Sequence, residues 1–283
     1  MEDDAGTRLW LPPLALAGCV RAVMLRDTRG RGLPPEARDN YFPATPLVSL
    51  IWWFQGRSEW LATPGFSTPA GEEDAGAVLL AGPFTQPTHT RNDGEVHALT
   101  LLLLPDAFAA LTGLDPGRFA HRVVDAPRHL PADWQAWLDT LRHLPDDTAR
   151  LRALEDFLVP HWQALGSQRS GHRYSAWTEA LAMRAATSAA GRSLRQRERR
   201  IKTWAGLPLR ELRAVSRAER AFYAVAAADG QPGVNWADIA AETDYADQSH
   251  LCRETRRLTG FSPEDLRRRM STEEAFWPYR LWR

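Results

Sequence analysis

The chain has 283 residues, 44% of them apolar, which is enough for about two globular domains with cores of ordinary size. All its apolar runs, Leu99 to Pro105 among them, are shorter than the ~18 residues of a membrane span, and the N-terminus is acidic, so we expect neither a membrane anchor nor a secretory signal. The 35 basic and 35 acidic side chains give zero net charge, which by itself argues against nucleic-acid binding.

Four segments between residues 16 and 104 are predicted strands, because they are rich in β-branched, aromatic and other apolar side chains: 16–25, 47–54, 78–81 and 96–104. Turn-prone stretches separate them, and Asp93-Gly94 stands where a hairpin turn would join two strands. Many short strands with such turns predict an antiparallel sandwich or barrel. An aromatic set could line an effector pocket in this domain, with plain core packing as the alternative: Trp52, Trp53, Phe54 and Trp60. Of these, Trp52, Phe54 and Trp60 are the predicted pocket residues.

The pattern becomes helical after Pro105. We predict a short helix over 106–112, ended by Gly113, and two amphipathic helices with apolar residues spaced i, i+3, i+4 and i+7 over 131–144 and 147–165. A polar stretch at 166–171 is the predicted domain boundary. The expected fold class is therefore α+β, with a β-rich barrel or sandwich for effector binding or dimerisation at 1–113, a helical connector at 114–171, an all-α domain at 172–270 and an aromatic tail at 271–283.

The all-α part contains an internal repeat with an offset of 54 residues. Ser193–Leu212 aligns with Asp247–Leu266. In this alignment Arg199 matches Arg253, and Gly206 matches Gly260 at the predicted end of the helix. Each copy has a short helix, a turn, a basic helix of about 12 residues and a Gly C-cap, which is the order of a helix-turn-helix. The repeat therefore predicts a tandem helix-turn-helix domain.

Charge is distributed unevenly between the two parts. Residues 173–283 hold 20 basic and 14 acidic side chains, against 15 and 21 in residues 1–172, and such an asymmetry suggests that one half meets a polyanion. The densest basic cluster is Arg192 to Lys202, with Glu198 as its only acid. A solvated helix face is the alternative interpretation of this cluster.

The second copy shows how the residues suit DNA. A helix over 235–242 would bury apolar side chains, Thr243-Asp244-Tyr245 would form the turn, and Asp247 is a good N-cap for a helix over 248–259. With Leu251 and Leu258 facing the core, short polar side chains and arginines remain outside, which is what major-groove base edges and phosphates require.

Here the sequence resembles a known family. Tyr245-Ala246-Asp247-Gln248-Ser249-His250-Leu251-Cys252-Arg253, followed by Leu258-Thr259-Gly260-Phe261-Ser262-Pro263, is similar to the C-terminal signature of the AraC/XylS transcription regulators. The resemblance covers about residues 175–269. It implies two helix-turn-helix units joined by a long helix over about 209–228, which spans ~30 Å and so approaches the ~34 Å between successive major-groove faces.

The resemblance thus implies a sequence-specific DNA-binding transcription regulator, modulated through its N-terminal domain by a small molecule or by dimerisation. We expect double-stranded DNA as the partner, with a small-molecule effector and a second copy of the chain as further candidates, no membrane and no cofactor. The candidate DNA-binding residues are Arg195, Gln196, Arg199, Lys202, Gln248, Ser249, His250, Arg253, Arg256 and Arg257.

The family pattern is not matched everywhere. Asp244 stands where the family usually has Gly, Ile201 and Thr255 stand where it usually has Phe, and the first copy has Arg197 at the position of Leu251. Whether the first unit contacts bases therefore stays open, as do the effector, the operator and the sign of regulation.

Two rival functions differ in class. An enzyme of the alkylation-repair type would need a reactive cysteine or a metal site, for which Cys19 and His89 are the candidates; His97 lies on another predicted strand, and we expect no metal. A protein–protein adaptor built on a helical repeat is the other rival. Two cysteines, Cys19 and Cys252, are too few for a disulfide framework, so a reducing cytoplasm is the expected compartment.

Overall fold

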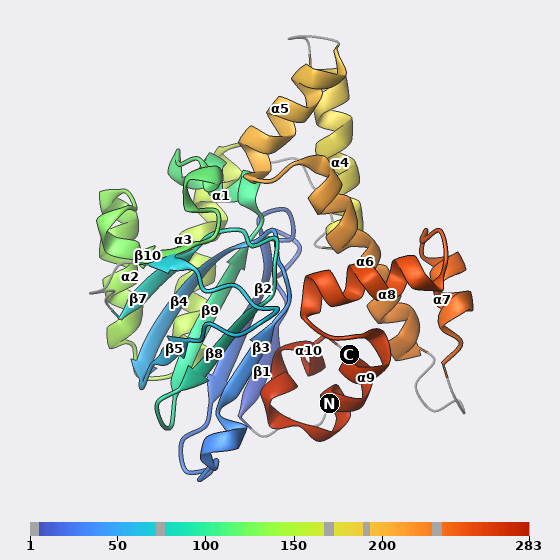
Figure 1. Cartoon of the computed structure of the whole chain (residues 1–283). Helices are drawn as coiled ribbons and strands as arrows, with labels where there is room; N and C mark the ends of the chain where they lie inside the picture. Colours follow the sequence, from blue (N-terminus) through green and yellow to red (C-terminus); the bar gives the residue numbers. More distant parts are fainter. Residues whose placement is uncertain (1–5, 72–76, 167–172, 189–192, 228–233, 283) are drawn as a thin grey trace.

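The computed structural model describes residues 6–71, 77–166, 173–188, 193–227 and 234–282. Figure 1 shows a β-rich N-terminal part whose sheets lie beside a helical C-terminal part, with helices α2 and α3 behind the larger sheet. Among the described residues, none of the helices has the length and apolar character needed to cross a bilayer.

Two sheets form the N-terminal part, and they settle the choice between barrel and sandwich in favour of a sandwich-like arrangement. The larger sheet has the strand order β1-β2-β9-β4-β7-β10-β6 and the smaller has the order β3-β8-β5. Neighbours are antiparallel except β10 and β6. The strands are β1 (Thr7–Trp10), β2 (Val20–Asp27), β3 (Asp39–Phe42), β4 (Val48–Gln55), β5 (Ser58–Trp60), β6 (Ala70–Gly71), β7 (Val78–Ala81), β8 (Thr88–Asn92), β9 (His97–Leu103) and β10 (Arg122–Asp125).

The turn at Asp93-Gly94 is not a hairpin turn, contrary to the sequence-based expectation. It joins β8 to β9, but β8 pairs with β3 and β5, whereas β9 pairs with β2 and β4. Each strand already has its partners within its own sheet, so the turn carries the chain from one sheet to the other.

The helices follow the predicted pattern closely. Gly113 has φ 73 and caps α1 in the left-handed region that glycine adopts readily, as its position in the sequence indicated. The helices are α1 (Pro105–Thr112), α2 (Ala132–His143), α3 (Asp147–Ala164), α4 (Tyr174–Thr187), α5 (Leu194–Ala205), α6 (Leu209–Ala227), α7 (Trp236–Glu242), α8 (Gln248–Thr259), α9 (Pro263–Thr272) and α10 (Trp277–Arg280), with short 3-10 turns η2 (Pro116–Phe119) and η4 (Glu274–Phe276) among others.

One large apolar core continues from the sandwich into the helical part. Phe108 of α1 and the buried Trp177 and Leu181 of α4 belong to the same cluster as the sheet residues, and Ile201 of α5 joins it. Much of the predicted boundary at 166–171 lies outside the described residues, so the limits of the domains stay a prediction. The aromatic tail contacts both parts, since Trp277 Nε1 donates to Asn40 Oδ1 of β3 at 2.7 Å and Phe276 packs on Phe261.

Candidate nucleic-acid interface and the cavity behind it

The second helix-turn-helix unit is built as the sequence indicated. Asp244 has φ 62, a left-handed conformation that Asp tolerates better than most residues, and it turns the chain between α7 and α8. Asp247 caps α8 by accepting a hydrogen bond from the backbone N of His250 at 2.6 Å, and Gly260, with φ 84, ends the helix. Leu251 and Leu258 are buried. The unit therefore presents one face of α8 to solvent.

The exposed face of α8 carries a stripe of three side chains. Ser249, Arg253 and Arg256 are exposed and lie at i, i+4 and i+7, which is one side of a helix. Gln248 is exposed beside them. Two other candidate DNA-binding residues make hydrogen bonds within the chain. His250 Nδ1 accepts from the backbone N of Ala246 at 3.3 Å, and Arg257 donates to Glu211 Oε2 at 2.9 Å.

Sequence reasoning missed Glu254. Its carboxylate is 9% exposed and receives a bidentate hydrogen bond from Arg217 of α6, with Nη2 to Oε1 at 2.8 Å and Nε to Oε2 at 3.1 Å. The signal was available, because residues 251, 254 and 258 share the inward side of α8 and an acid there needs a buried partner. Arg217 and Glu254 thus fix α8 on the long helix.

The first unit carries an equivalent stripe on α5. Ser193 caps α5 in a capping box with Gln196, and Ile201 and Ala205 are the buried positions of the helix. The basic side chains exposed on the other face are Arg195, Arg199 and Lys202. Arg192 of the predicted basic cluster lies outside the described residues. Gln196 is exposed, but its Oε1 accepts from the backbone N of Ser193 at 3.4 Å.

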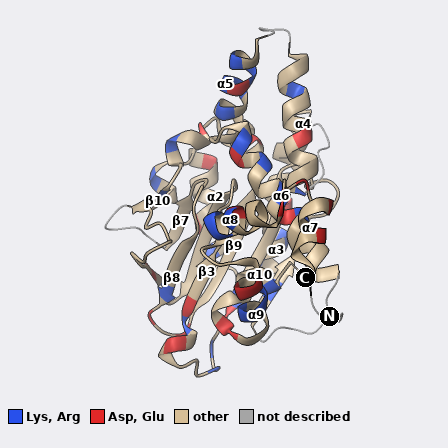
Figure 2. Ribbon diagram, turned by 45° about the vertical axis from the view of Figure 1, so that its right-hand side comes forward, with Lys and Arg blue, Asp and Glu red and all other residues tan. Residues whose placement is uncertain are grey.

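The two stripes occupy the same positions of the repeat. Adding the offset of 54 to 195, 199 and 202 gives 249, 253 and 256, so the exposed faces of α5 and α8 correspond residue by residue. Arg197, at the position of Leu251, is half-buried instead of fully buried, which is the departure noted in the sequence. The 19 residues of α6 join the units and span about 28 Å at 1.5 Å per residue. In Figure 2 the blue segments of the ribbon mark Lys and Arg positions on both helices.

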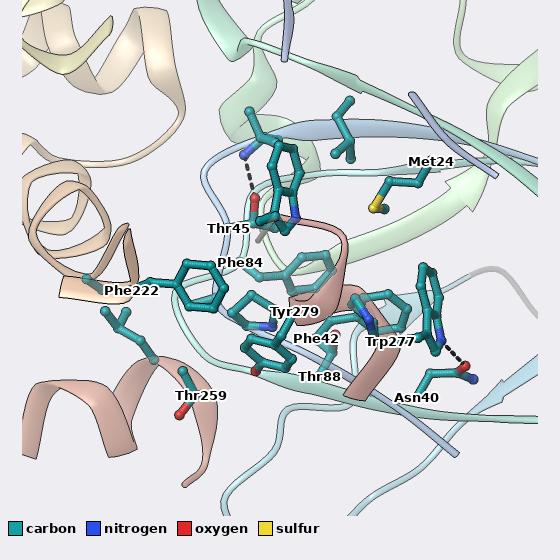
Figure 3. A pocket seen from close by; sticks show the side chains of 18 of the residues that line it. Met24, Asn40, Phe42, Thr45, Phe84, Thr88, Phe222, Thr259, Trp277 and Tyr279 are labelled. Atoms are coloured by element: carbon teal, nitrogen blue, oxygen red, sulfur yellow. Dashed lines mark hydrogen bonds between the residues drawn. The ribbon is translucent and has the colours of Figure 1, made fainter. Parts of the chain in front are cut away.

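A cavity of about 320 Å³ lies between the two sheets. Strands of both sheets line it, and α6, α8, α9 and the tail close it on the side of the helix-turn-helix domain. Figure 3 shows Phe84, Phe222, Trp277 and Tyr279 around this space. Its lining therefore comes from both parts of the molecule.

Only one of the three predicted pocket aromatics lines this cavity. Trp60 does, but Trp52 and Phe54 lie on the opposite face of β4, where Trp52 Nε1 donates to the carbonyl of Leu138 at 3.2 Å and Phe54 packs against His97. Because side chains alternate along a strand, it is Trp53 that points into the cavity.

Two buried arginines of β2 reach the cavity. A β-bulge between Val20 and Ala22 turns Arg21 toward the same face as Arg26. Arg21 Nη2 bonds Glu219 Oε1 of α6 at 2.8 Å, and Arg26 Nη2 bonds Glu274 Oε1 of the tail at 2.7 Å. Burial raises the pKa of Glu219, and the charge of Arg21 opposes this rise. Burial also lowers the pKa of Arg26. Both ion pairs join the sandwich to the C-terminal part.

The two candidate enzyme residues occupy structural positions. Cys19 is fully buried, and burial raises the pKa of its thiol to about 12, so a nucleophilic thiolate does not form near neutral pH. His89 is buried, with its Nδ1 3.1 Å from Thr63 Oγ1. Within the described ranges, no three His, Cys, Asp or Glu side chains are grouped as metal ligands.

Comparisons with known proteins place the C-terminal part in a family. A family model described as a helix-turn-helix domain matches residues 186–269. No match was found among curated proteins. Solved structures of ToxT from Vibrio cholerae resemble the chain, one with an unsaturated fatty acid bound at 12% identity and TM-score 0.37 over 85% of this chain and 92% of that one. Another, bound to (E)-4-(8-methylnaphthalen-1-yl)but-3-enoic acid, shows 9% identity and TM-score 0.33 over 80% and 96%.

The matched segment contains both basic helices, α5 and α8, so this part of the chain is a helix-turn-helix domain. The same segment holds most of the residues that resemble the AraC/XylS signature, so the match agrees with the resemblance found in the sequence.

Proposed function

We propose that the chain regulates transcription by binding double-stranded DNA through the exposed stripes of α5 and α8, and that a small apolar molecule in the cavity changes this binding. The observation that carries the proposal is that α5 and α8 expose side chains at the same three positions of the repeat. These positions are 195, 199 and 202 in α5 and 249, 253 and 256 in α8. A cytoplasmic location, where the protein would meet DNA, belongs to the same proposal.

The readout of bases is assigned mainly to Arg253. It follows Asp247 by six residues, so it lies about one and a half turns into α8, and the exposed Ser249 lies one turn before it on the same face. An arginine there can pair with guanine through two hydrogen bonds, which is worth about 1–3 kcal/mol of discrimination. Arg256 and the basic side chains of α5 would contact phosphates.

The test begins with DNA selected from a random pool by the full chain. Arg253→Ala should relax the preference at one or two base positions by roughly tenfold, while leaving the affinity for random DNA nearly unchanged. Arg142→Ala, which removes a similarly exposed arginine from α2, is the matched control and should change neither quantity. Equal weakening of every sequence by Arg253→Ala would make this residue a phosphate contact and contradict its assignment to base reading.

The effector site is assigned to the cavity because its walls are mostly apolar and come from both the sandwich and the DNA-binding part. Filling it should therefore block an apolar probe. We expect Ala98→Phe, on the cavity face of β9, to reduce the fluorescence enhancement of 8-anilinonaphthalene-1-sulfonate at least severalfold and to change DNA affinity. The exposed replacement Ala136→Phe on α2 is the control. Undiminished dye binding by Ala98→Phe would contradict the assignment of the effector site to this cavity.

A further inference from the structure

The C-terminal ends of the two basic helices, α5 and α8, contact the N-terminal part of the chain. We call these two helices the recognition helices. Helices α5 and α8 are capped by Gly206, with φ 72, and by Gly260, with φ 84. A Cβ on Gly206 would lie 3.1 Å from the backbone N of Gly117 in η2, and a Cβ on Gly260 would lie 2.5 Å from Cζ of Phe66. The two glycines therefore do more than adopt a left-handed conformation, because their missing side chains also allow the sandwich to approach.

Further contacts join each helix-turn-helix unit to the N-terminal part. In the first unit, Trp177 of α4 donates from Nε1 to Asp106 Oδ1 of α1 at 2.8 Å, and Arg184 of α4 pairs with the other carboxylate oxygen at 3.0 Å. In the second unit, the backbone N of Ala44 donates to the carbonyl of Leu258 in the last turn of α8 at 2.7 Å. The N-terminal part therefore meets both units, at the ends of α5 and α8 and along α4.

We propose that the sandwich fixes the distance and angle between α5 and α8 by docking on both C-cap glycines, so that Phe66 and Gly117 are positioning residues that determine which spacing of two DNA sub-sites the chain accepts. This inference rests on the proposed DNA-binding function. The two units share only one long helix as their covalent support, and a helix of this length can bend. Two additional supports outside the helix would hold its ends in one relative arrangement.

The chain offers a matched control for this idea. Gly113 caps α1 with φ 73, nearly the value of Gly260, but a Cβ there would meet nothing within 4 Å. Gly113→Ala and Gly260→Ala therefore introduce the same left-handed strain, and only the second adds a methyl group that pushes Phe66 away. Phe66→Val combined with Gly260→Ala makes room for that methyl group and serves as the rescue variant.

The experiment compares these full-length variants on the selected DNA site and on the same site with one base pair inserted between its two halves. The wild-type chain and Gly113→Ala should lose roughly tenfold affinity on the insertion. Gly260→Ala should lose only about two- to threefold, and the rescue variant should recover most of the discrimination. Gly206→Ala, which meets the backbone of η2, should act in the same direction as Gly260→Ala.

Hydrogen exchange without DNA separates this inference from the proposed function. Gly260→Ala should accelerate amide exchange around Phe66, over residues 61–67, while Gly113→Ala should not. A wild-type chain that selects no DNA sequence would refute the proposed function, and the exchange data would then still decide whether the docking contact exists. Equal spacing preference in Gly260→Ala and Gly113→Ala, or equal exchange over residues 61–67, would overturn the inference.

Discussion

Asp147 connects three elements through one carboxylate. It begins α3, and its Oδ1 lies 3.0 Å from His97 Nε2 of β9 and accepts from Arg150 at 2.8 Å, while Oδ2 accepts from Arg8 of β1 at 3.0 Å. The hydrogen bond with His97 is the largest influence that lowers the pKa of Asp147 to about 2, and Arg150 adds to it against the effect of burial. The ionised form is therefore the one that stabilises the fold.

This lowered pKa predicts an acid-dependent loss of stability. Because the folded pKa of about 2 is below the ordinary value of 3.8, the contribution is complete above pH 3.8 and disappears as the pH falls toward 2. Asp147→Asn should lower the free energy of unfolding by about 2 kcal/mol at pH 7, with the difference from wild type shrinking toward pH 2. Urea unfolding at pH 7, 5 and 3 measures it, and the exposed Asp139→Asn on α2 should change little.

At the same scale, single side chains show where sequence reasoning reached its limit. The aromatic residues of β4 were recognised, but not which of them face the cavity, because apolar side chains occupy both faces of this strand and hydrophobic alternation is lost. One face is buried in the core and the other lines the cavity, so Trp52 and Trp53 look equivalent in sequence. Only the register of β4 between β7 and β9 separates them.

Among the elements, helices were predicted more accurately than strand pairing. The bounds of α8 agree with the sequence because a capping Asp and a terminal Gly mark both ends locally. The partners of β8 and β9 had no such local marker, since the choice between sheets depends on contacts far apart in the chain. The bulge that redirects Arg21 was equally hidden, because nothing in the neighbouring residues requires the extra residue.

At the scale of the whole molecule, the sandwich and the DNA-binding part pack against each other, and buried ion pairs join them. Arg21 and Glu219 are almost fully enclosed, with side-chain exposures of 4% and 8%. Glu219 also accepts from the backbone N of Tyr174 at 2.9 Å, and the guanidinium of Arg21 lies 4.3 Å from the ring centroid of Trp282. The same side chains line the cavity, so an occupant would lie beside the ion pair that links the two parts.

A buried pair of this kind predicts strong coupling in a double-mutant cycle. Arg21→Met leaves the Glu219 carboxylate without its partner, and Glu219→Met does the same to the guanidinium, so each single change should cost about 3–5 kcal/mol of unfolding free energy. The double variant replaces both charges with apolar groups and should be far less destabilised than the sum of the singles, giving a coupling energy of at least about 2 kcal/mol.

The matched control is Arg57–Asp93, an exposed pair within the sandwich at 3.2 Å, whose coupling should be below about 1 kcal/mol because solvent screens it. Chemical denaturation of all variants at one pH measures both cycles. Equal coupling energies in the two pairs would mean that solvent screens Arg21 and Glu219 as well. This outcome would contradict the prediction of a strong buried ion pair between β2 and α6. Unequal coupling of the expected size would show that separating the DNA-binding part from the sandwich must break a buried charge pair, and the cost of breaking this pair would oppose their separation.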